Sequence, residues 1–531
     1  MSQHLQWLDW AVIAVYLFLL MAMAVWLARQ QGSREDYYVG GRSIGAWPIA
    51  ISVMATQCST NSILGAPAFV GFSAGGGLLW LQYELAVPLA MLLLILFFVP
   101  RLRQLHLVSV YSFLEERFDL STRLMLSGLF LFVRAFATAV TVYSIALVID
   151  LISGVGFVWA VILLGVFTVV YDTFGGMRGV VYSDVVQMII LVAVLLLVLY
   201  GVTQDIGGLK QMWSSVNPAR KQTLEFDHHG LGDGYTFAFW PMLLGGLFLY
   251  VAYYGCDQSQ VQRILSTRSV QQSNKALMLN GLLRFPLVAV YCFVGLALAV
   301  YAAQNPAFIQ ALPLHDEQPQ YNLVVPLYML THLPAGLVGL GLVALFAAAM
   351  SSLDSVINSL SATTMEDFLR RVRRSPWSAR QELWISRAVT VFWGTVTLIM
   401  AFYVGDIAPT VLEAINKIGS LANGPILAVF IAGLLLPKVH ALGIKTGFVV
   451  GILSNLLCWL FLPQVSWLWW NVLGCLFALG CACIVSRVYS QSNQAICAWP
   501  DLAVSTDKSR YGIGLTLWAL ILFGFLFWLN S

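Results

Sequence analysis

The chain has 531 residues, of which 59% are hydrophobic and 10% are charged, and its formal net charge is +3. Soluble domains carry charge on nearer ~25% of their residues, so this composition excludes a soluble globular protein and indicates an integral membrane protein. The small net charge points to no nucleic-acid partner, and no obligatory protein partner is evident from the composition.

Apolar runs recur along the chain and are continuous for ~20 residues, which predicts membrane-spanning helices, because the lipid-facing strands of a β-barrel would alternate over ~10 residues. We therefore expect an all-α membrane protein with about fourteen transmembrane helices. The runs lie at about 8–28, 45–70, 77–99, 122–150, 156–173, 181–202, 236–255, 276–302, 336–368, 386–406, 411–436, 443–463, 466–486 and 511–529. The first run is expected to be a retained helix, because no basic region precedes it as in a signal peptide.

Basic residues set the expected orientation of these helices. If the N-terminus lies outside, most of the 28 Lys and Arg residues fall in cytoplasmic loops, as the positive-inside rule requires. The densest basic loop, RRVRR from Arg370, then fixes the end of the preceding helix to the cytoplasm. Because the number of spans is even, we expect both termini outside, in a multi-pass protein of the cell (plasma or inner) membrane.

Two of the apolar runs are interrupted. In ISVMATQCSTNSILGAP the polar stretch from Thr56 to Ser62 falls at mid-membrane, and in WPMLLGGLFLYVAYYGCDQ Pro241 and the pair Gly245 and Gly246 lie inside the run. Backbone groups freed at such points must bond to protein, water or an ion. Interrupted helices at matching positions of two halves predict a transporter site near the membrane midplane.

The predicted domain organisation follows from these interruptions. Segments 45–203 and 236–436 each begin at an interrupted run and hold about five spans. Because five is odd, the second segment enters the membrane from the opposite side, which makes the two segments inverted repeats. Residues 1–44 and 437–531 then supply extra helices on either side.

The run from Gly336 to Leu369 carries hydroxyls and a carboxyl half-way along, which is costly in a bilayer. At helical spacing its small side chains share one face, namely Ala344, Ala348, Ser351, Ser352, Ser355, Ser359 and Ala362. One interpretation is close helix packing alone. The other adds an ion, because Ser351, Ser352 and Ser355 present oxygens beside Asp354, and small hard cations prefer oxygen ligands.

Motifs for other chemistries are missing from the sequence. It contains no Walker A, GxGxxG or HExxH pattern, so it gives no support for a nucleotide-driven pump or for an enzyme. Most of the eight cysteines fall in apolar runs without His partners at metal-ligand spacing, and we expect them to be buried small residues.

Three longer motifs occur in order: FGGMRGVVYSDVVQ from Phe174, YYGCDQSQVQR from Tyr253, and AAAMSSLDSVINSLSATTMEDF from Ala347. Over roughly 30–440 the chain resembles the sodium:solute symporter family, which includes sodium/glucose, proline, sialic acid, iodide, vitamin and monocarboxylate transporters. The resemblance implies a leucine-transporter-like five-plus-five inverted repeat with discontinuous helices.

The same resemblance implies sites for sodium. One sodium ion would be held by backbone carbonyls of Ala55, Cys58 and Ala348 and by the hydroxyls of Ser351 and Ser352. Some members bind a second ion, for which the matching residues are Asp184, Asp354 and Ser355; Asp354 stands where certain relatives carry a hydroxyl. The family pattern also places Arg134 close to Asp184, and a buried charge pair is expected there.

The resemblance places the solute site beside the interrupted helices. The residues that match or neighbour solute-contacting places are Gln57, Ser59, Asn61, Ser62, Glu84, Asp257, Gln258, Arg284 and Asn416. Glu84 lies in an apolar span and must either pair or face water. Arg284 has two interpretations, a bidentate clamp on a substrate carboxylate or a side chain that snorkels to the cytoplasmic surface.

These inferences favour sodium-coupled secondary active symport by alternating access, with Na⁺ as the coupling ion. The solute is expected to be a small polar organic molecule, with a carboxylate-bearing or vitamin-like solute favoured over sugar. Two alternatives remain open: a membrane sensor built on a symporter fold, and a proton-coupled carrier in which Asp354 or Asp184 titrates.

Overall fold

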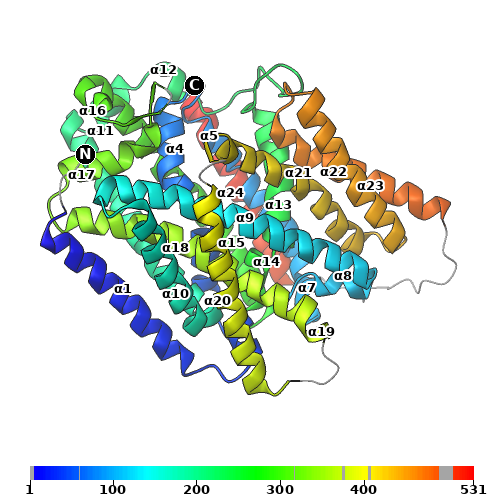
Figure 1. Ribbon diagram of the computed structural model, residues 1–531. Helices are drawn as coiled ribbons and strands as arrows, with labels where there is room; N and C mark the ends of the chain where they lie inside the picture. Colours follow the sequence, from blue (N-terminus) through cyan, green and yellow to red (C-terminus); the bar gives the residue numbers. More distant parts are fainter. Residues whose placement is uncertain are drawn as a thin grey trace.

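The computed structural model describes residues 5–58, 60–315, 317–372, 377–404, 408–489 and 506–530. The described chain is helical except for one antiparallel hairpin, β1 (Leu314–His315) and β2 (Gln318–Pro319), in a loop (Figure 1). The expectation of an all-α membrane protein is confirmed at this level.

Within the described residues, ten helices are long and apolar enough to cross a membrane. They are α1 (Trp7–Ala28), α5 to α7 (Trp80–Gln104), α9 (Leu120–Ser153), α10 (Phe157–Ile206), α15 (Val270–Gln304), α18 to α19 (Leu337–Val372), α20 (Ala379–Tyr403), α22 (Ala441–Phe461), α23 (Trp467–Val488) and α24 (Thr506–Asn530). Three shorter apolar helices cover Ser62–Phe72, Pro241–Cys256 and Gly419–Leu435; the last belongs to α21 (Ala408–Leu435).

Short helices lie mostly in the connections between these long ones. They are α2 (Arg34–Val39), η1 (Gly40–Arg42), α8 (Ser112–Arg117), α11 (Leu209–Ser215), α12 (Pro218–Lys221), α16 (Pro306–Gln310), η4 (Tyr321–Leu323) and α17 (Val324–His332). Helices α11, α12, α16 and α17 gather near both chain ends at the upper edge of Figure 1. Hydrogen bonds agree with this placement, since Asp9 accepts from the Gly336 N–H at 2.7 Å and Asn530 accepts from the Thr223 N–H at 2.9 Å.

The first interrupted run is broken where the sequence predicts. Helix α3 (Ala46–Gln57) ends at Cys58, whose φ of −78° and ψ of 67° are not helical, and α4 (Thr60–Phe72) begins two residues later. Because the helix ends here, the carbonyls of the last turn of α3 do not receive the N–H donors of a following helical turn among the described residues.

The second interrupted run breaks later than the sequence predicts. Pro241–Gly245 forms a wide π-type turn, η3, that continues without a gap into α13 (Gly246–Cys256). The chain leaves helical geometry at Asp257, with φ −84° and ψ 126°, and α14 (Gln258–Leu265) follows. A proline in the first turn is tolerated there because its missing N–H is not needed.

Helix α10 (Phe157–Ile206) contains both runs expected at 156–173 and 181–202. They are two helical segments that meet at Gly176, whose φ of 54° and ψ of −159° are not helical. A Cβ on Gly176 would lie 2.8 Å from the Tyr37 carbonyl oxygen, so both the positive φ and the close approach require glycine. The two helical segments are therefore joined at a single non-helical glycine.

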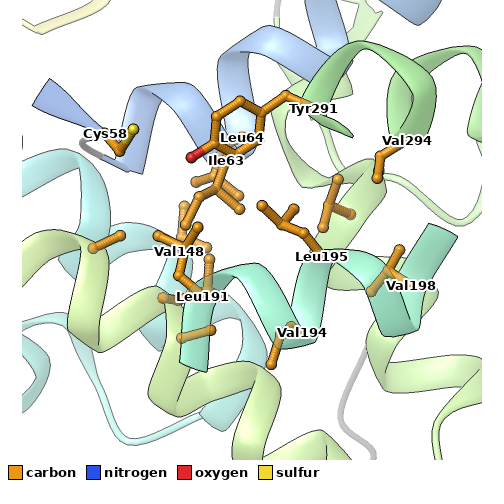
Figure 2. Close-up of a cluster of buried hydrophobic side chains, with 14 of the residues drawn as sticks. Cys58, Ile63, Leu64, Val148, Leu191, Val194, Leu195, Val198, Tyr291 and Val294 are labelled. Atoms are coloured by element: carbon orange, nitrogen blue, oxygen red, sulfur yellow. The ribbon is translucent and has the colours of Figure 1, made fainter. Parts of the chain in front are cut away.

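Helix α18 (Leu337–Thr363) lies at the centre of the molecule and packs against α1, α3, α9 and α10. Its small side chains permit these approaches; Ala347, Ala348 and Ala362 are fully buried. Figure 2 shows part of the surrounding core, where aliphatic side chains of α10, including Leu191 and Leu195, pack toward α4 and α15 close to Cys58. The residues on either side of the α3–α4 break therefore pack into this buried core.

Candidate functional site

Both helix breaks open onto one cavity of about 1780 Å³. Gln57 and Ser62 line it from the first break, and Cys256 and Asp257 line it from the second. The cavity extends to Gln318–Leu323, in the loop that carries the hairpin. Its wall is rich in aromatic side chains and also contains two arginines, which suits a solute with both polar and apolar parts.

The two broken helices also touch one another at the cavity. The Tyr254 hydroxyl, in the last turn of α13, donates a hydrogen bond to the side-chain carbonyl of Gln57, the last residue of α3. This hydrogen bond links the two breaks directly.

Of the nine side chains expected at the solute site, five line this cavity: Gln57, Ser62, Glu84, Asp257 and Arg284. Ser59, and the side chains of Asn61 and Asn416, lie outside the described residues. Gln258 does not line the cavity and corrects the prediction. It is fully buried, donates to the Val108 carbonyl at 2.7 Å and accepts from the Val110 N–H at 2.7 Å, so it braces the backbone.

Arg284 and Glu84 form an ion pair in the cavity wall. The Arg284 Nε lies 3.0 Å from a Glu84 oxygen, and the Tyr250 hydroxyl lies 3.3 Å from the other Glu84 oxygen. The Arg284 side chain is 8% exposed, so it does not snorkel to the surface. It also does not present a free clamp, because Glu84 already occupies one edge of the guanidinium.

The expected pairing of Arg134 with Asp184 is wrong. Arg134 forms its ion pair with Asp257 at the second break, and Asp184 pairs with Arg263 at 3.2 Å. The physical reason is that α14 follows the break at Asp257 and packs against α3, which places Arg263 beside Asp184 of α10. Arg134 pairs with Asp257 at the break itself. Each of these four charges therefore has a partner, as the cost of desolvation requires.

The sodium-type residues of α3 and α18 are brought together. The Ser351 hydroxyl lies 3.4 Å from the Ala55 carbonyl oxygen and 3.2 Å from that of Ala348. The Ser352 hydroxyl lies 3.5 Å from the Thr56 carbonyl oxygen and 3.4 Å from that of Ala348. These oxygens are neutral and converge on the gap left by the break, and such a set suits a monovalent hard cation.

The residues matched to a second ion lie one turn further along α18, in a charged cluster. Asp184 accepts from the Ser52 hydroxyl at 2.5 Å and from Arg263, whose side chain also donates to Ser355. The Ser355 hydroxyl lies 3.1 Å from a carboxylate oxygen of Asp354. Asp184, Asp354 and Ser355 therefore belong to one hydrogen-bonded network, with Arg263 as its cation.

The sequence interpretation missed two members of this network and one buried carboxyl beside it. Arg263 and Tyr171 were not selected, although Tyr171 donates to Asp354 and Arg263 ends one of the three motifs. Asp172 was also missed; it is fully buried and lies two residues before the first motif. A carboxyl next to an apolar run was the available signal for Asp172.

Comparisons with known proteins identify the family of the chain. The model of the sodium:solute symporter family matches residues 37–451. The sodium/sialic acid symporter of Aliivibrio fischeri is 30% identical over 460 residues, which cover 86% of this chain and 88% of that protein. The sodium-coupled monocarboxylate transporter 1 of Mus musculus is 30% identical over 454 residues, covering 84% of this chain and 72% of that protein.

Solved structures share the fold. The structure of a Na⁺-coupled sialic acid symporter in a substrate-bound outward-open state superposes with a TM-score of 0.81 at 24% identity, covering 92% of this chain and all of that one. A nucleobase-cation-symport-1 family transporter superposes with a TM-score of 0.56 at 13% identity, covering 90% of this chain and 98% of that one.

Proposed function

Because the chain belongs to the sodium:solute symporter family and is a sodium-coupled solute symporter, we propose that it imports a small, carboxylate-bearing or vitamin-like solute by alternating access. The observation that carries the ion half of this proposal is the α3–α4 break facing α18. Two hydroxyls and three carbonyls meet there across a helix interruption, and none of these groups carries a charge. In the proposed site the carbonyl of Cys58 completes the set, since a thiol is a poor sodium ligand.

The second proposed ion lies beside Asp184, Asp354 and Ser355. A cation there would meet two carboxylates, of which Asp184 pairs with Arg263 and Asp354 is connected to Arg263 through the Ser355 hydroxyl, so the local charge favours the cation. The first site needs no carboxylate, and the two sites therefore differ in how strongly each depends on charge.

The solute half of the proposal rests on the cavity. Of the two guanidinium groups in its wall, Arg134 is the more accessible, with its side chain 26% exposed against 8% for Arg284. A substrate carboxylate would therefore contact Arg134 more readily than Arg284. The aromatic wall suits the apolar part of the solute. The relatives' names include sialic acid, monocarboxylates and vitamins, and many of these solutes carry a carboxylate.

The proposed topology has about fourteen crossings, because α10 at 1.5 Å per residue would be far longer than a bilayer of ~30 Å and must cross twice around Gly176. With the three shorter apolar helices, this gives one extra helix in 1–44, five crossings in each of the inverted repeats 45–203 and 236–436, and the remaining helices in 437–531. Both termini face outside the cell membrane, on the side where the cavity opens.

In the proposed cycle, sodium binds from outside, draws the end of α3 to α18, and stabilises the outward-open state. The bond between Tyr254 and Gln57 passes this change to the second break, where Asp257 and Arg134 meet the solute. Linkage makes the coupling reciprocal: an ion that raises solute affinity has its own affinity raised equally. Each charge moved supplies ~2.3 kcal/mol per 100 mV of membrane potential, in addition to the ion gradient.

Uptake by proteoliposomes tests the proposal. Sodium, potassium and proton gradients are imposed one at a time, with radiolabelled sialic acid, monocarboxylates, vitamins and glucose as solutes. We expect accumulation of a carboxylate-bearing solute only with an inward sodium gradient. Accumulation driven by a proton gradient alone would favour the proton-coupled carrier, and sodium binding without transport of any solute would favour the sensor.

A further inference from the structure

Asp172 is a buried carboxyl that the sodium and solute sites do not use. It lies in α10 and has no solvent exposure. One of its carboxylate oxygens accepts from the side-chain amide of Asn358 at 3.2 Å, and the other has no hydrogen-bond partner among the described residues. Asn358 lies one helical turn beyond Asp354 on α18, so Asp172 flanks the proposed second sodium site without contacting it through a hydrogen bond among the described residues.

The hydrogen bonds around Asp172 have a fixed direction. The Val110 N–H donates to the Gln258 carbonyl oxygen, so the amide of Gln258 donates to Gln262. Gln262 in turn donates to the Asn358 oxygen at 2.9 Å, which leaves the Asn358 amide to donate to Asp172. The Val110 N–H therefore fixes the orientation of all three side-chain amides in this series of hydrogen bonds. As a result, Asn358 turns its neutral N–H donor, and not its oxygen, toward Asp172.

The three carboxyl groups of the region are stabilised unequally. Asp184 has a guanidinium and a hydroxyl, and Asp354 accepts from the hydroxyls of Tyr171, Ser183 and Ser355. Asp172 has one neutral amide. An unpaired buried carboxylate is strongly unfavourable, so of the three groups Asp172 is the one for which the protonated form is most favoured.

The net charge of the cluster also favours the protonated form of Asp172. Arg263 is the one guanidinium that contacts it among the described residues, against the three carboxyls. The titratable or charged side chains that face Asp172 from the neighbouring elements are Asp354 on α18, Asp184 and Tyr171 on α10, Arg263 on α14, and Tyr37 and Tyr38 on α2. With all carboxyls ionised, the cluster would carry two negative charges in excess.

We propose that Asp172 is a proton site, protonated when sodium is absent and deprotonated when sodium binds beside Asp184 and Asp354. The inference rests on the proposed second sodium site. When a sodium ion adds a positive charge there, the O–H bond of Asp172 breaks, the electron pair stays on the carboxylate, and the proton passes to water. By reciprocity, acid weakens sodium binding, by up to about tenfold per pH unit.

Proton release on sodium binding tests the inference without knowledge of the solute. Purified protein in detergent and weak buffer, with a pH-indicator dye, receives sodium chloride or choline chloride, while a parallel sample measures thermal stability. We expect sodium alone to stabilise the wild type and to release up to about one proton per chain. Asp172→Asn should still be stabilised by sodium, with the release largely lost.

Two further variants keep the inference testable even if Asp172→Asn does not fold. Asn358→Ala removes the one hydrogen bond to Asp172 but keeps the carboxyl, so the pH of half-maximal release should rise. Asp205→Asn, near the other end of α10 and bonded to Tyr328, is the matched control and should release as the wild type does. Undiminished release from Asp172→Asn, an unmoved pH midpoint in Asn358→Ala, or sodium stabilisation of the wild type without release would each overturn the inference. Failure of sodium to stabilise the wild type would overturn the sodium site itself.

Discussion

The two helix breaks differ in how their free backbone groups are satisfied. At the first, α3 ends before Cys58, and among the described residues the carbonyls of Ala55 and Thr56 meet the hydroxyls of Ser351 and Ser352 at the long distances of 3.4 and 3.5 Å. At the second, Asp257 caps α14 through the Ser259 N–H at 2.9 Å and also pairs with Arg134. The first break therefore leaves oxygens for a cation, whereas the protein itself satisfies the second.

In the proposed cycle this difference gives the two breaks different tasks. The first break would respond to sodium, because its carbonyls face the proposed ion. The second break would respond to the solute, because the solute would compete for the ion pair of Arg134 and Asp257. Arg263, which follows the second break, donates to Ser52 on α3 and joins the two regions at 2.7 Å.

Removal of that junction should have the largest effect. Arg263→Ala leaves Asp184 buried without its cation, and loss of one partner of a buried pair costs ~3–5 kcal/mol. We expect little folded protein, measured as the monodisperse peak in size-exclusion chromatography. The double variant Arg263→Met with Asp184→Asn should give more folded protein than Arg263→Ala, because it leaves no unpaired charge at this position. Wild-type yield from Arg263→Ala would show that the two breaks are held together by other contacts.

The hydroxyls at the first break should be next in effect. Ser351→Ala or Ser352→Ala removes an oxygen from the proposed sodium site, and a contact to a charged group contributes ~1.5–3 kcal/mol, so half-saturation by sodium should rise about 10- to 100-fold. Sodium-dependent uptake measures this, normalised to protein abundance. Ser359→Ala is the control, because that hydroxyl donates to the Ser355 carbonyl at 2.8 Å. An unchanged sodium dependence in both variants would contradict the site.

Substitutions at the second break should change solute affinity and leave sodium binding unchanged. Asp257→Ala removes both the cap and the ion pair, and a lost cap costs ~1 kcal/mol of stability. Asp257→Asn keeps an oxygen for the cap but removes the charge that pairs with Arg134, so it should lose less stability than Asp257→Ala while changing solute affinity. In both variants the thermal stabilisation by sodium, measured without solute, should match the wild type. A weakened sodium response would mean that both breaks hold the ion.

How much of this was predictable depends on how local each feature is. The break before Ser59 and the hydroxyls of α18 were readable, because polar residues within an apolar run are costly wherever the helices lie. The partners of Arg134 and Asp184 were not, because pairing depends on helix rotation and on where α14 resumes after Asp257. The two runs joined at Gly176 were readable, but the exact point of the interruption was not, because Gly175, Gly176 and Gly179 all lie in the connecting segment and the close approach of Tyr37 to Gly176 is a tertiary contact.

The smallest effect is expected far from both breaks, at the start of α9. Burial raises the pKa of Asp119, but Lys445 at 2.8 Å and the hydrogen bonds of Thr122 and Ser121 outweigh burial and lower the pKa to about 2. Because the pKa is lowered by folding, the stabilisation is complete above about pH 4 and is lost as the pH falls toward 2. The pair is about one-third exposed, so Lys445→Ala should cost only a few tenths of a kcal/mol near neutral pH. Thermal unfolding at pH 7 measures it; a large loss would mean that α9 depends on this cap.

Direct binding of radioactive sodium to the purified protein tests the central claim, that the cation lies between the end of α3 and Ser351 and Ser352. We predict saturable binding to the wild type and to Ser359→Ala, and weaker binding with fewer ions per chain in the Ser351→Ala and Ser352→Ala double variant. Equal affinity and stoichiometry in the double variant would place the cation elsewhere and contradict the account.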